Sequence, residues 1–294
     1  MSLITDDDRA FFEENGYVVV EGAVPADRCE AVVDRLWDFL GKSPDDPESW
    51  YSPPDGMDDY FGNQSGGMIE MYHSQEQWDV YQHPRVYQAA AEILEREDLW
   101  IHLDRVNMTP PLRKEHPELT NDFIHWDTDT TDLPDPIPQP HGIQGVLYLE
   151  DTDPDQGGFQ CSPALYRELD AEWFEDHPEH AENRSVPTDA YPVEAIPGEQ
   201  GDFLIWDSML PHGNGENTGE EPRLAQYLNF YGADWANVER REDRVSTYRE
   251  RSTPTGAAYP GDPRNREQER PPADLTPLGR KLLGLDPWHG WLDG

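Results

Sequence analysis

The stretch Phe123-Ile124-His125-Trp126-Asp127 places a histidine and an aspartate two residues apart in a segment typical of a β-strand. Side chains of a strand alternate between its faces, so His125 and Asp127 point one way and Trp126 points the other. One imidazole and one carboxylate aimed at one point are two of the three ligands of the 2-His-1-carboxylate site common in non-haem Fe(II) oxygenases. On spacing alone the signal is weak, because a polar strand end also produces it.

His212 is the best candidate for the missing imidazole. It follows the buried strand predicted for residues 203–206 and precedes the turn Gly213-Asn214-Gly215. Eleven residues later, Arg223 begins another predicted strand, which runs to Tyr231. We expect this strand to share a hairpin with the His212 strand, so that Arg223 lies deep in the same cleft. An arginine there is a bidentate clamp for a carboxylate.

Composition sets limits on the class of protein. The 294 residues carry 61 acidic and 22 basic side chains, for a net charge of −39. With 11% aromatic residues the chain is not disordered, so the charge must coat a folded surface, as suits a salty cytoplasm. Nucleic-acid binding is excluded by the charge, and we expect no membrane partner because no apolar run has transmembrane length. Two cysteines allow no disulfide framework, so we expect a reducing cytoplasmic location. For the assembly, we expect a monomer or a small homo-oligomer.

The order of predicted elements indicates one domain over residues 1–294. Residues 1–100 read as helical support and a lid: helices over 6–14, 25–40 and 84–96, the first capped by Thr5 and ended by Gly16, and an aromatic loop over 42–67. Residues 100–232 contain short strands separated by turns, which favours a sandwich or barrel. One of these strands is predicted over 99–108, and 173–192 reads as irregular. Residues 233–294 read as a C-terminal wrap that docks through an apolar cluster over 275–291.

The set His125, Asp127, His212 and Arg223 resembles the site of the phytanoyl-CoA dioxygenase family of Fe(II)- and 2-oxoglutarate-dependent oxygenases. Three further segments carry the resemblance. Residues 11–20 followed by Pro25-Ala26-Asp27 resemble the opening helix, strand and helix of the family, residues 156–159 resemble its Gly-rich turn, and residues 201–223 are similar to its distal segment. Together they extend the resemblance over about residues 5–231.

The resemblance implies an α+β protein with a mainly β core, a double-stranded β-helix of the jelly-roll or cupin type with N-terminal and flanking helices. It implies that His125, Asp127 and His212 bind Fe(II), that Arg223 binds 2-oxoglutarate, and that O2 takes the remaining position. The implied reaction hydroxylates an unactivated C–H and releases succinate and CO2, with ascorbate supporting activity. Related halogenases lack the carboxylate ligand, so the presence of Asp127 favours hydroxylation.

The sequence departs from the family at two places. Pro163-Ala164-Leu165-Tyr166 stands where many members have Pro-Gly-Ser-His. The lysine that contacts 2-oxoglutarate in many members is also missing, and Asn107 or Arg105 is expected to replace it. Gln144, on the strand predicted over 143–149, is a further candidate contact to the co-substrate, or else a satisfied polar residue inside the barrel.

The substrate is expected to be a small or medium organic molecule. A binding site for acyl-CoA would need a basic patch for the phosphates, and a chain with only three lysines argues against such a patch. Candidate wall residues are Trp50, Tyr51, Tyr72, His73 and His102, although the loop aromatics also suit simple packing. Two alternatives stay open: a cupin-like oxygenase that does not use 2-oxoglutarate, and a non-catalytic sensor or interaction domain.

Overall fold

The computed structural model describes residues 2–53, 67–120, 124–127, 142–183, 186–257 and 261–288. Phe123, Trp291 and much of the aromatic 42–67 loop lie outside these ranges, so expectations about them are not followed further. No helix among the described residues is long and apolar enough to cross a membrane.

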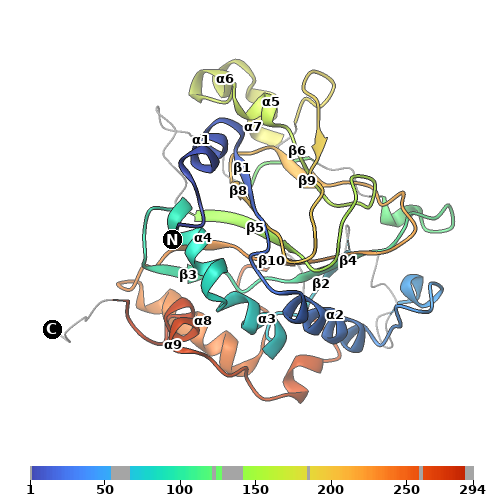
Figure 1. Ribbon diagram of the computed structural model, residues 1–294, viewed down its shortest axis with the longest axis vertical. Helices are drawn as coiled ribbons and strands as arrows, with labels where there is room; N and C mark the ends of the chain where they lie inside the picture. Colours follow the sequence, from blue (N-terminus) through green and yellow to red (C-terminus); the bar gives the residue numbers. More distant parts are fainter. Residues whose placement is uncertain are drawn as a thin grey trace.

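Two antiparallel sheets face each other and enclose the interior (Figure 1). The larger sheet has the order β1 (Tyr17–Val20), β8 (Phe203–Asp207), β5 (Gly142–Tyr148), β10 (Arg223–Tyr227), β4 (Val106–Thr109) and β2 (Met68–Ile69). In addition, β11 (Phe230–Gly232) pairs with the beginning of β5, and β3 (Leu99–Ile101) pairs with β11. The smaller sheet has the order β7 (Glu194–Ala195), β6 (Phe159–Cys161) and β9 (His212–Asn214). This jelly-roll arrangement confirms the predicted fold class.

Strand alternation divides the apolar residues of the larger sheet into two cores. Val18, Leu147 and Ile205 belong to the core that the helices share. Their sequence neighbours Val19, Val146 and Leu204 belong to a second core, which includes residues of the smaller sheet. The second face is therefore the inside of the sandwich, and any polar side chain on it points into the space between the sheets.

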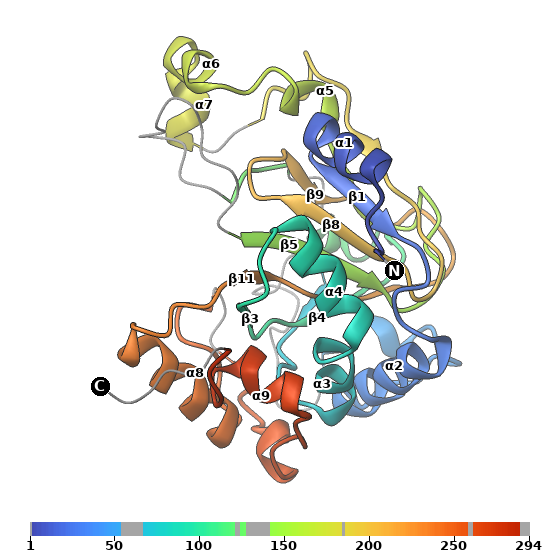
Figure 2. The same ribbon diagram turned by 60° about the vertical axis from the view of Figure 1, so that its left-hand side comes forward.

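Helices surround the sandwich. The N-terminal ones are α1 (Asp6–Asn15), α2 (Ala26–Leu40), α3 (Gln75–Tyr81) and α4 (Pro84–Ile93), and the C-terminal ones are α8 (Val238–Glu250) and α9 (Pro277–Leu283). Between β6 and β7 the chain forms α5 (Pro163–Tyr166), α6 (Ala171–Asp176) and α7 (Pro178–Asn183). Figure 2 shows α5–α7 at one end of the molecule and α8 and α9 at the other. Short 3-10 turns occur at Ser49–Tyr51, Pro117–Leu119 and Arg266–Glu269.

The limits of α1 are as predicted from local sequence. Thr5 accepts a hydrogen bond from the Asp8 backbone N–H while the Asp8 side chain accepts from the Thr5 backbone, which completes a capping box. Gly16 ends the helix with φ of 78°, a left-handed conformation that glycine adopts without strain.

Two predicted segments differ in the structure. The strand predicted over 99–108 is interrupted between β3 and β4, because the side chain of Asp104 accepts hydrogen bonds from the Arg105 backbone and from Asn229. The segment predicted as irregular over 173–192 contains the end of α6 and the whole of α7. The aromatic residues Trp173 and Phe174 give α6 a buried side that composition alone did not reveal.

The C-terminal segment is anchored by a buried arginine on α8. The Arg244 guanidinium donates to the Tyr231 hydroxyl and to the carbonyls of Ile101, Leu282 and Leu283. These contacts join α8 to β3, β11 and α9. Helices α8 and α9 are therefore packed against the part of the larger sheet that β3 and β11 form.

Glu267 joins the same segment to the body. One carboxylate oxygen accepts hydrogen bonds from the backbone N–H groups of Tyr72 and His73. Burial raises the pKa of Glu267 to about 8, despite these hydrogen bonds. The folded state therefore holds a proton that the unfolded chain releases near pH 4.3.

We expect the Glu267 contribution to stability to be complete at pH 4 and lost as pH rises to about 8. Glu267→Gln keeps the accepting oxygen but cannot ionise. The variant should therefore gain stability relative to wild type as pH rises, by on the order of a few kcal/mol. Urea unfolding of both proteins at pH 5 and pH 9 measures this, with exposed Glu269→Gln as control. A difference between wild type and variant that is the same at both pH values would contradict it.

Candidate metal centre

A single backbone pairing brings the two candidate histidines together. His125 and His212 form an isolated antiparallel bridge in which each backbone N–H donates to the carbonyl of the other, at 2.9 and 3.0 Å. His125 therefore lies in a one-residue bridge and not in the longer strand expected, whereas His212 begins β9. The imidazole centroids are 4.8 Å apart.

Asp127 completes a three-residue centre. His125 Nε2 lies 3.3 Å from Asp127 Oδ1, and His212 Nε2 lies 3.5 Å from Asp127 Oδ2. One potential ligand atom from each side chain lies within 4.8 Å of the others. Two imidazoles and one carboxylate converging in this way form the donor set that suits a non-haem iron or a similar divalent ion.

Hydrogen bonds hold the centre ready for a cation. His212 Nδ1 lies 2.8 Å from the Leu210 carbonyl, which can only accept, so Nδ1 donates to that carbonyl and Nε2 is the nitrogen that faces Asp127 and the centre. Burial acts to raise the pKa of Asp127, but hydrogen bonds from His125 and His212 outweigh it and hold that pKa well below its usual range. The carboxylate is therefore charged at any physiological pH.

Two residues of the larger sheet support the ligands. Gln144 Nε2 donates to Asp127 Oδ2 at 2.5 Å, and Trp206 Nε1 donates to Gln144 Oε1 at 2.9 Å. Trp206 also packs against His212, with ring centroids 5.1 Å apart. The sequence analysis did not single out Trp206, although the β8 alternation already placed it on the inner face.

Trp126 points away from the centre, as the alternation predicted. Its indole is fully buried and makes edge contacts with Trp173 and Phe174 of α6, at centroid distances of 6.2 and 5.6 Å. Helix α6 therefore covers the back of the segment that carries His125 and Asp127. The indole fixes which way the two ligands face.

Arg223 lies on the inner face of β10 and is completely buried. None of its three side-chain nitrogens has a hydrogen-bond partner among the described residues. A buried guanidinium without an anion is costly, so this residue marks a place for an anionic ligand. The positive charge of Arg223 acts to lower the pKa of Tyr148, but burial has the larger effect and raises that pKa overall.

The predicted hairpin between the His212 and Arg223 strands is wrong. β9 pairs with β6 in the smaller sheet, whereas β10 pairs with β4 and β5 in the larger sheet. His212 and Arg223 nevertheless border the same interior, because the two sheets face each other. The eight residues between β9 and β10 cross from one sheet to the other.

The two candidate replacements for the family lysine, and Gln144 as a further candidate contact to the co-substrate, have different surroundings. Arg105 pairs with Asp104 at 3.1 Å. Asn107 accepts a hydrogen bond from Thr109, which stands opposite Arg223 in the β4–β10 register. Gln144 contacts the Asp127 carboxylate. Asn107 therefore lies nearest to Arg223 by register, and the co-substrate role of all three stays a prediction.

Four of the five candidate wall residues have structural partners. Trp50 donates to the Ser43 carbonyl, and the Tyr51 hydroxyl donates to the Pro111 carbonyl. The Tyr72 hydroxyl lies 3.5 Å from Glu70. The ring of buried His73 lies 2.7 Å from the Ser252 carbonyl. These contacts attach loops to the body, which is the packing role that the sequence analysis left open.

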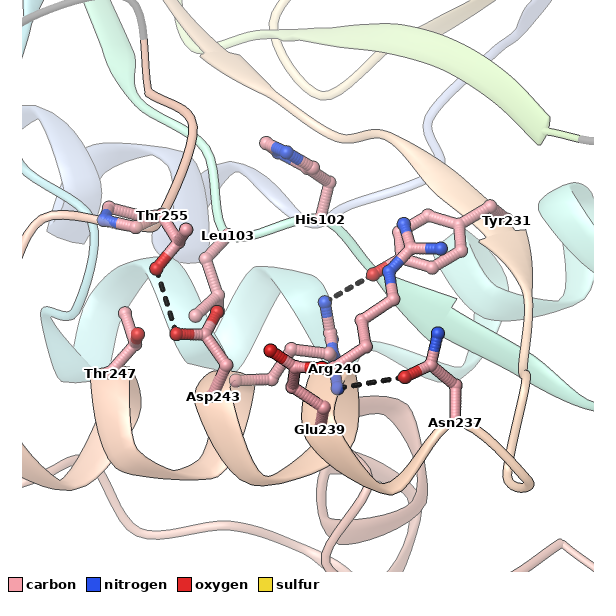
Figure 3. Close-up of a pocket in the computed structure, with 11 residues that line it drawn as sticks. His102, Leu103, Tyr231, Asn237, Glu239, Arg240, Asp243, Thr247 and Thr255 are labelled. Atoms are coloured by element: carbon pink, nitrogen blue, oxygen red, sulfur yellow. Dashed lines mark hydrogen bonds between the residues drawn. The ribbon is translucent and has the colours of Figure 1, made fainter.

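His102 lines a pocket of about 430 Å³ beside the open end of the sandwich (Figure 3). Helix α8 forms its floor and Tyr231 one wall, with Arg240 stacked on the Tyr231 ring at 4.3 Å. Tyr231 pairs with Gly142, and Gln144 is two residues further along β5 on the same face. Arg223 lies in the opposite direction, past Tyr148. Along β5, Gln144, which contacts Asp127, thus lies between the end that pairs with Tyr231 and the end nearer Arg223.

The fold and the converging side chains define a jelly-roll protein with a mononuclear metal centre of the 2-His-1-carboxylate kind. A model of the phytanoyl-CoA dioxygenase (PhyH) family matches residues 12–225, so the chain belongs to this family and the sequence resemblance is confirmed.

Individual relatives are distant. A Dictyostelium discoideum protein with the phytanoyl-CoA dioxygenase name is 20% identical, with 80% of this chain and 77% of that protein covered. HygX from Streptomyces hygroscopicus, solved with nickel and 2-oxoglutarate, has a TM-score of 0.55 at 14% identity, covering 80% and 89% of the two chains. EctD from S. alaskensis, solved with 2-oxoglutarate and 5-hydroxyectoine, has a TM-score of 0.54 at 20% identity, covering 79% and 77%. At such identities the structures establish the fold.

Loss of one imidazole should abolish metal binding. Removing a residue that only hydrogen-bonds to a metal ligand already lowers metal affinity by about 10–100-fold. We therefore expect His212→Ala, which removes a ligand itself, to weaken Ni(II) or anaerobic Fe(II) binding by more than about 100-fold. Isothermal titration calorimetry measures this, with His116→Ala as control because His116 stacks on Tyr51 away from the centre. Equal affinities in the wild type and His212→Ala would mean that the metal binds elsewhere.

Proposed function

We propose that this protein is an Fe(II)- and 2-oxoglutarate-dependent dioxygenase that hydroxylates an unactivated C–H of a small or medium organic molecule. His125, Asp127 and His212 would hold the iron, which would supply the chemistry that activates O2. The overall reaction would convert 2-oxoglutarate, O2 and the substrate into succinate, CO2 and the hydroxylated product. HygX and EctD, which share this fold, were solved with 2-oxoglutarate bound. The metal donor set supports the same assignment.

The observation that carries the proposal is Arg223, whose guanidinium has no hydrogen-bond partner in the part of the chain that the structure describes. Its guanidinium offers parallel N–H donors between the two sheets, and a carboxylate can accept two hydrogen bonds from them as a bidentate pair. A diacid can place one carboxylate on Arg223 and direct its other end toward the metal. If the protein were a metal enzyme that does not use a keto acid, no ligand would compensate the buried charge of Arg223, which has no hydrogen-bond partner among the described residues.

We expect Arg223→Met to have opposite effects on stability and binding. Without ligand the variant should be as stable as the wild type or about 1 kcal/mol more stable, because it removes an uncompensated buried charge. The affinity for 2-oxoglutarate should fall by at least about 100-fold, because two charge-assisted hydrogen bonds are lost. Anaerobic titration of the Fe(II) protein, followed by its visible charge-transfer absorption, measures the affinity. Urea unfolding measures the stability.

Exposed Arg249→Met on α8 is the matched control. An Arg223→Met protein that is much less stable than wild type and binds 2-oxoglutarate normally would identify Arg223 as a structural residue. Iron binding with no 2-oxoglutarate effect in the wild type would favour an oxygenase without a keto acid. Absence of iron binding would favour a non-catalytic domain.

We place the prime substrate in the pocket beside α8. The pocket is of a size for a small or medium molecule, and its wall residue Tyr231 pairs with the end of β5 away from Arg223. Its lining is polar and carries both signs of charge, from Arg240, Glu239 and Asp243. A large apolar chain would leave these groups without partners.

Filling the pocket should interfere with the substrate. Thr255 lines it and donates to Asp243. The test first finds which members of a panel of small polar metabolites stimulate succinate formation by the wild type. We expect Thr255→Trp to reduce that stimulation by about tenfold or more. Thr218→Trp, at an exposed turn outside the pocket, should leave the stimulation unchanged. Equal stimulation in both variants would place the substrate elsewhere.

A further inference from the structure

The amide of Gln144 lies between an indole and the carboxylate of the metal centre. Gln144 stands directly opposite Trp206 in the β5–β8 pairing, so both side chains point into the sandwich. Trp206 Nε1 donates to Gln144 Oε1 at 2.9 Å, and Gln144 Nε2 donates to Asp127 Oδ2 at 2.5 Å. The three side chains form one directed chain of hydrogen bonds that ends on a metal ligand.

The donors and acceptors allow only one orientation of this amide. An indole N–H can only donate, and an ionised carboxylate can only accept. The Gln144 oxygen must therefore face Trp206 and its NH2 group must face Asp127. A flipped amide would oppose two donors at one end and two acceptors at the other.

We propose that Gln144 and Trp206 are positioning residues that keep Asp127 as a one-oxygen metal ligand. Gln144 donates to Oδ2, and Oδ1, which lies 3.3 Å from His125 Nε2, is the oxygen that would bind the cation. A carboxylate that bound through both oxygens would occupy one further coordination position. That position is needed for the co-substrate or O2, so the inference rests on the proposed function.

Trp206 links this control to a second ligand. Its ring packs against His212 at 5.1 Å and against Phe159 at 4.6 Å, and it is 2% exposed. Phe159 in turn stacks on His212 at 5.8 Å. One indole therefore supports the His212 ring by packing and orients Asp127 through Gln144.

Two variants separate the hydrogen bonds from the packing. Gln144→Leu removes the donor to Asp127. Trp206→Phe keeps an aromatic ring but removes the N–H that orients the amide. Matched controls are Gln200→Leu, whose amide bonds the Leu149 carbonyl, and Trp78→Phe, a buried tryptophan whose Nε1 has no hydrogen-bond partner among the described residues.

The test uses Co(II) and Ni(II) as probes, without 2-oxoglutarate. We expect Gln144→Leu to weaken Ni(II) binding by about 10–100-fold and Trp206→Phe by about tenfold. The visible absorption of the Co(II) proteins should change in both variants, because band intensity reports coordination number. The two controls should match the wild type in affinity and spectrum. Far-UV circular dichroism checks that each variant is folded.

Unchanged Co(II) spectra and Ni(II) affinities in both folded variants would overturn the inference while leaving the metal centre in place. A separate anaerobic titration of the Fe(II) protein with 2-oxoglutarate covers the remaining case: a Gln144→Leu protein with wild-type metal binding and weakened 2-oxoglutarate binding would also overturn the inference, and would assign Gln144 to the co-substrate. A wild-type protein that binds neither metal would overturn the proposed function and this inference with it.

Discussion

The two backbone hydrogen bonds between His125 and His212 are the constraint on which the site depends. They connect a short segment near the middle of the chain to the smaller sheet, and without them the two imidazoles have no fixed relation. The bridge alone would not determine which side chains face inward. The packing of Trp126 under α6 does so, because an indole of that size cannot exchange places with its neighbours.

The interior of the sandwich combines a well-packed apolar core with costly polar groups. Val146, Leu204 and Ala225 fill one part, and unpaired Arg223 lies on the same face. On the helical side of the sheet, the buried charged residues Arg244 and Glu267 instead have hydrogen-bond partners within the protein. Stability is thus concentrated on one face of the larger sheet, which allows the other face to hold groups arranged for a ligand.

Sequence reasoning succeeded where a period of two was sufficient. It placed His125 and Asp127 on one face and Trp126 on the other, and the motifs around His212 identified the fold and family. It failed where the answer depended on which strands pair, because proximity in sequence does not decide between two sheets that face each other. The His212–Arg223 hairpin is one example. The partner of Gln144 is another, since only the β5–β8 register places Trp206 opposite it.

The pocket and the metal centre come from different parts of the chain. The ligands, Gln144 and Arg223 belong to the two sheets and the bridge between them, whereas most of the pocket lining belongs to α8 and the segment after it. Mutations after residue 232 can therefore change the shape and charge of the pocket without shifting any strand register. A lineage of such proteins can diverge in what it recognises through this segment alone, while the metal centre is inherited unaltered.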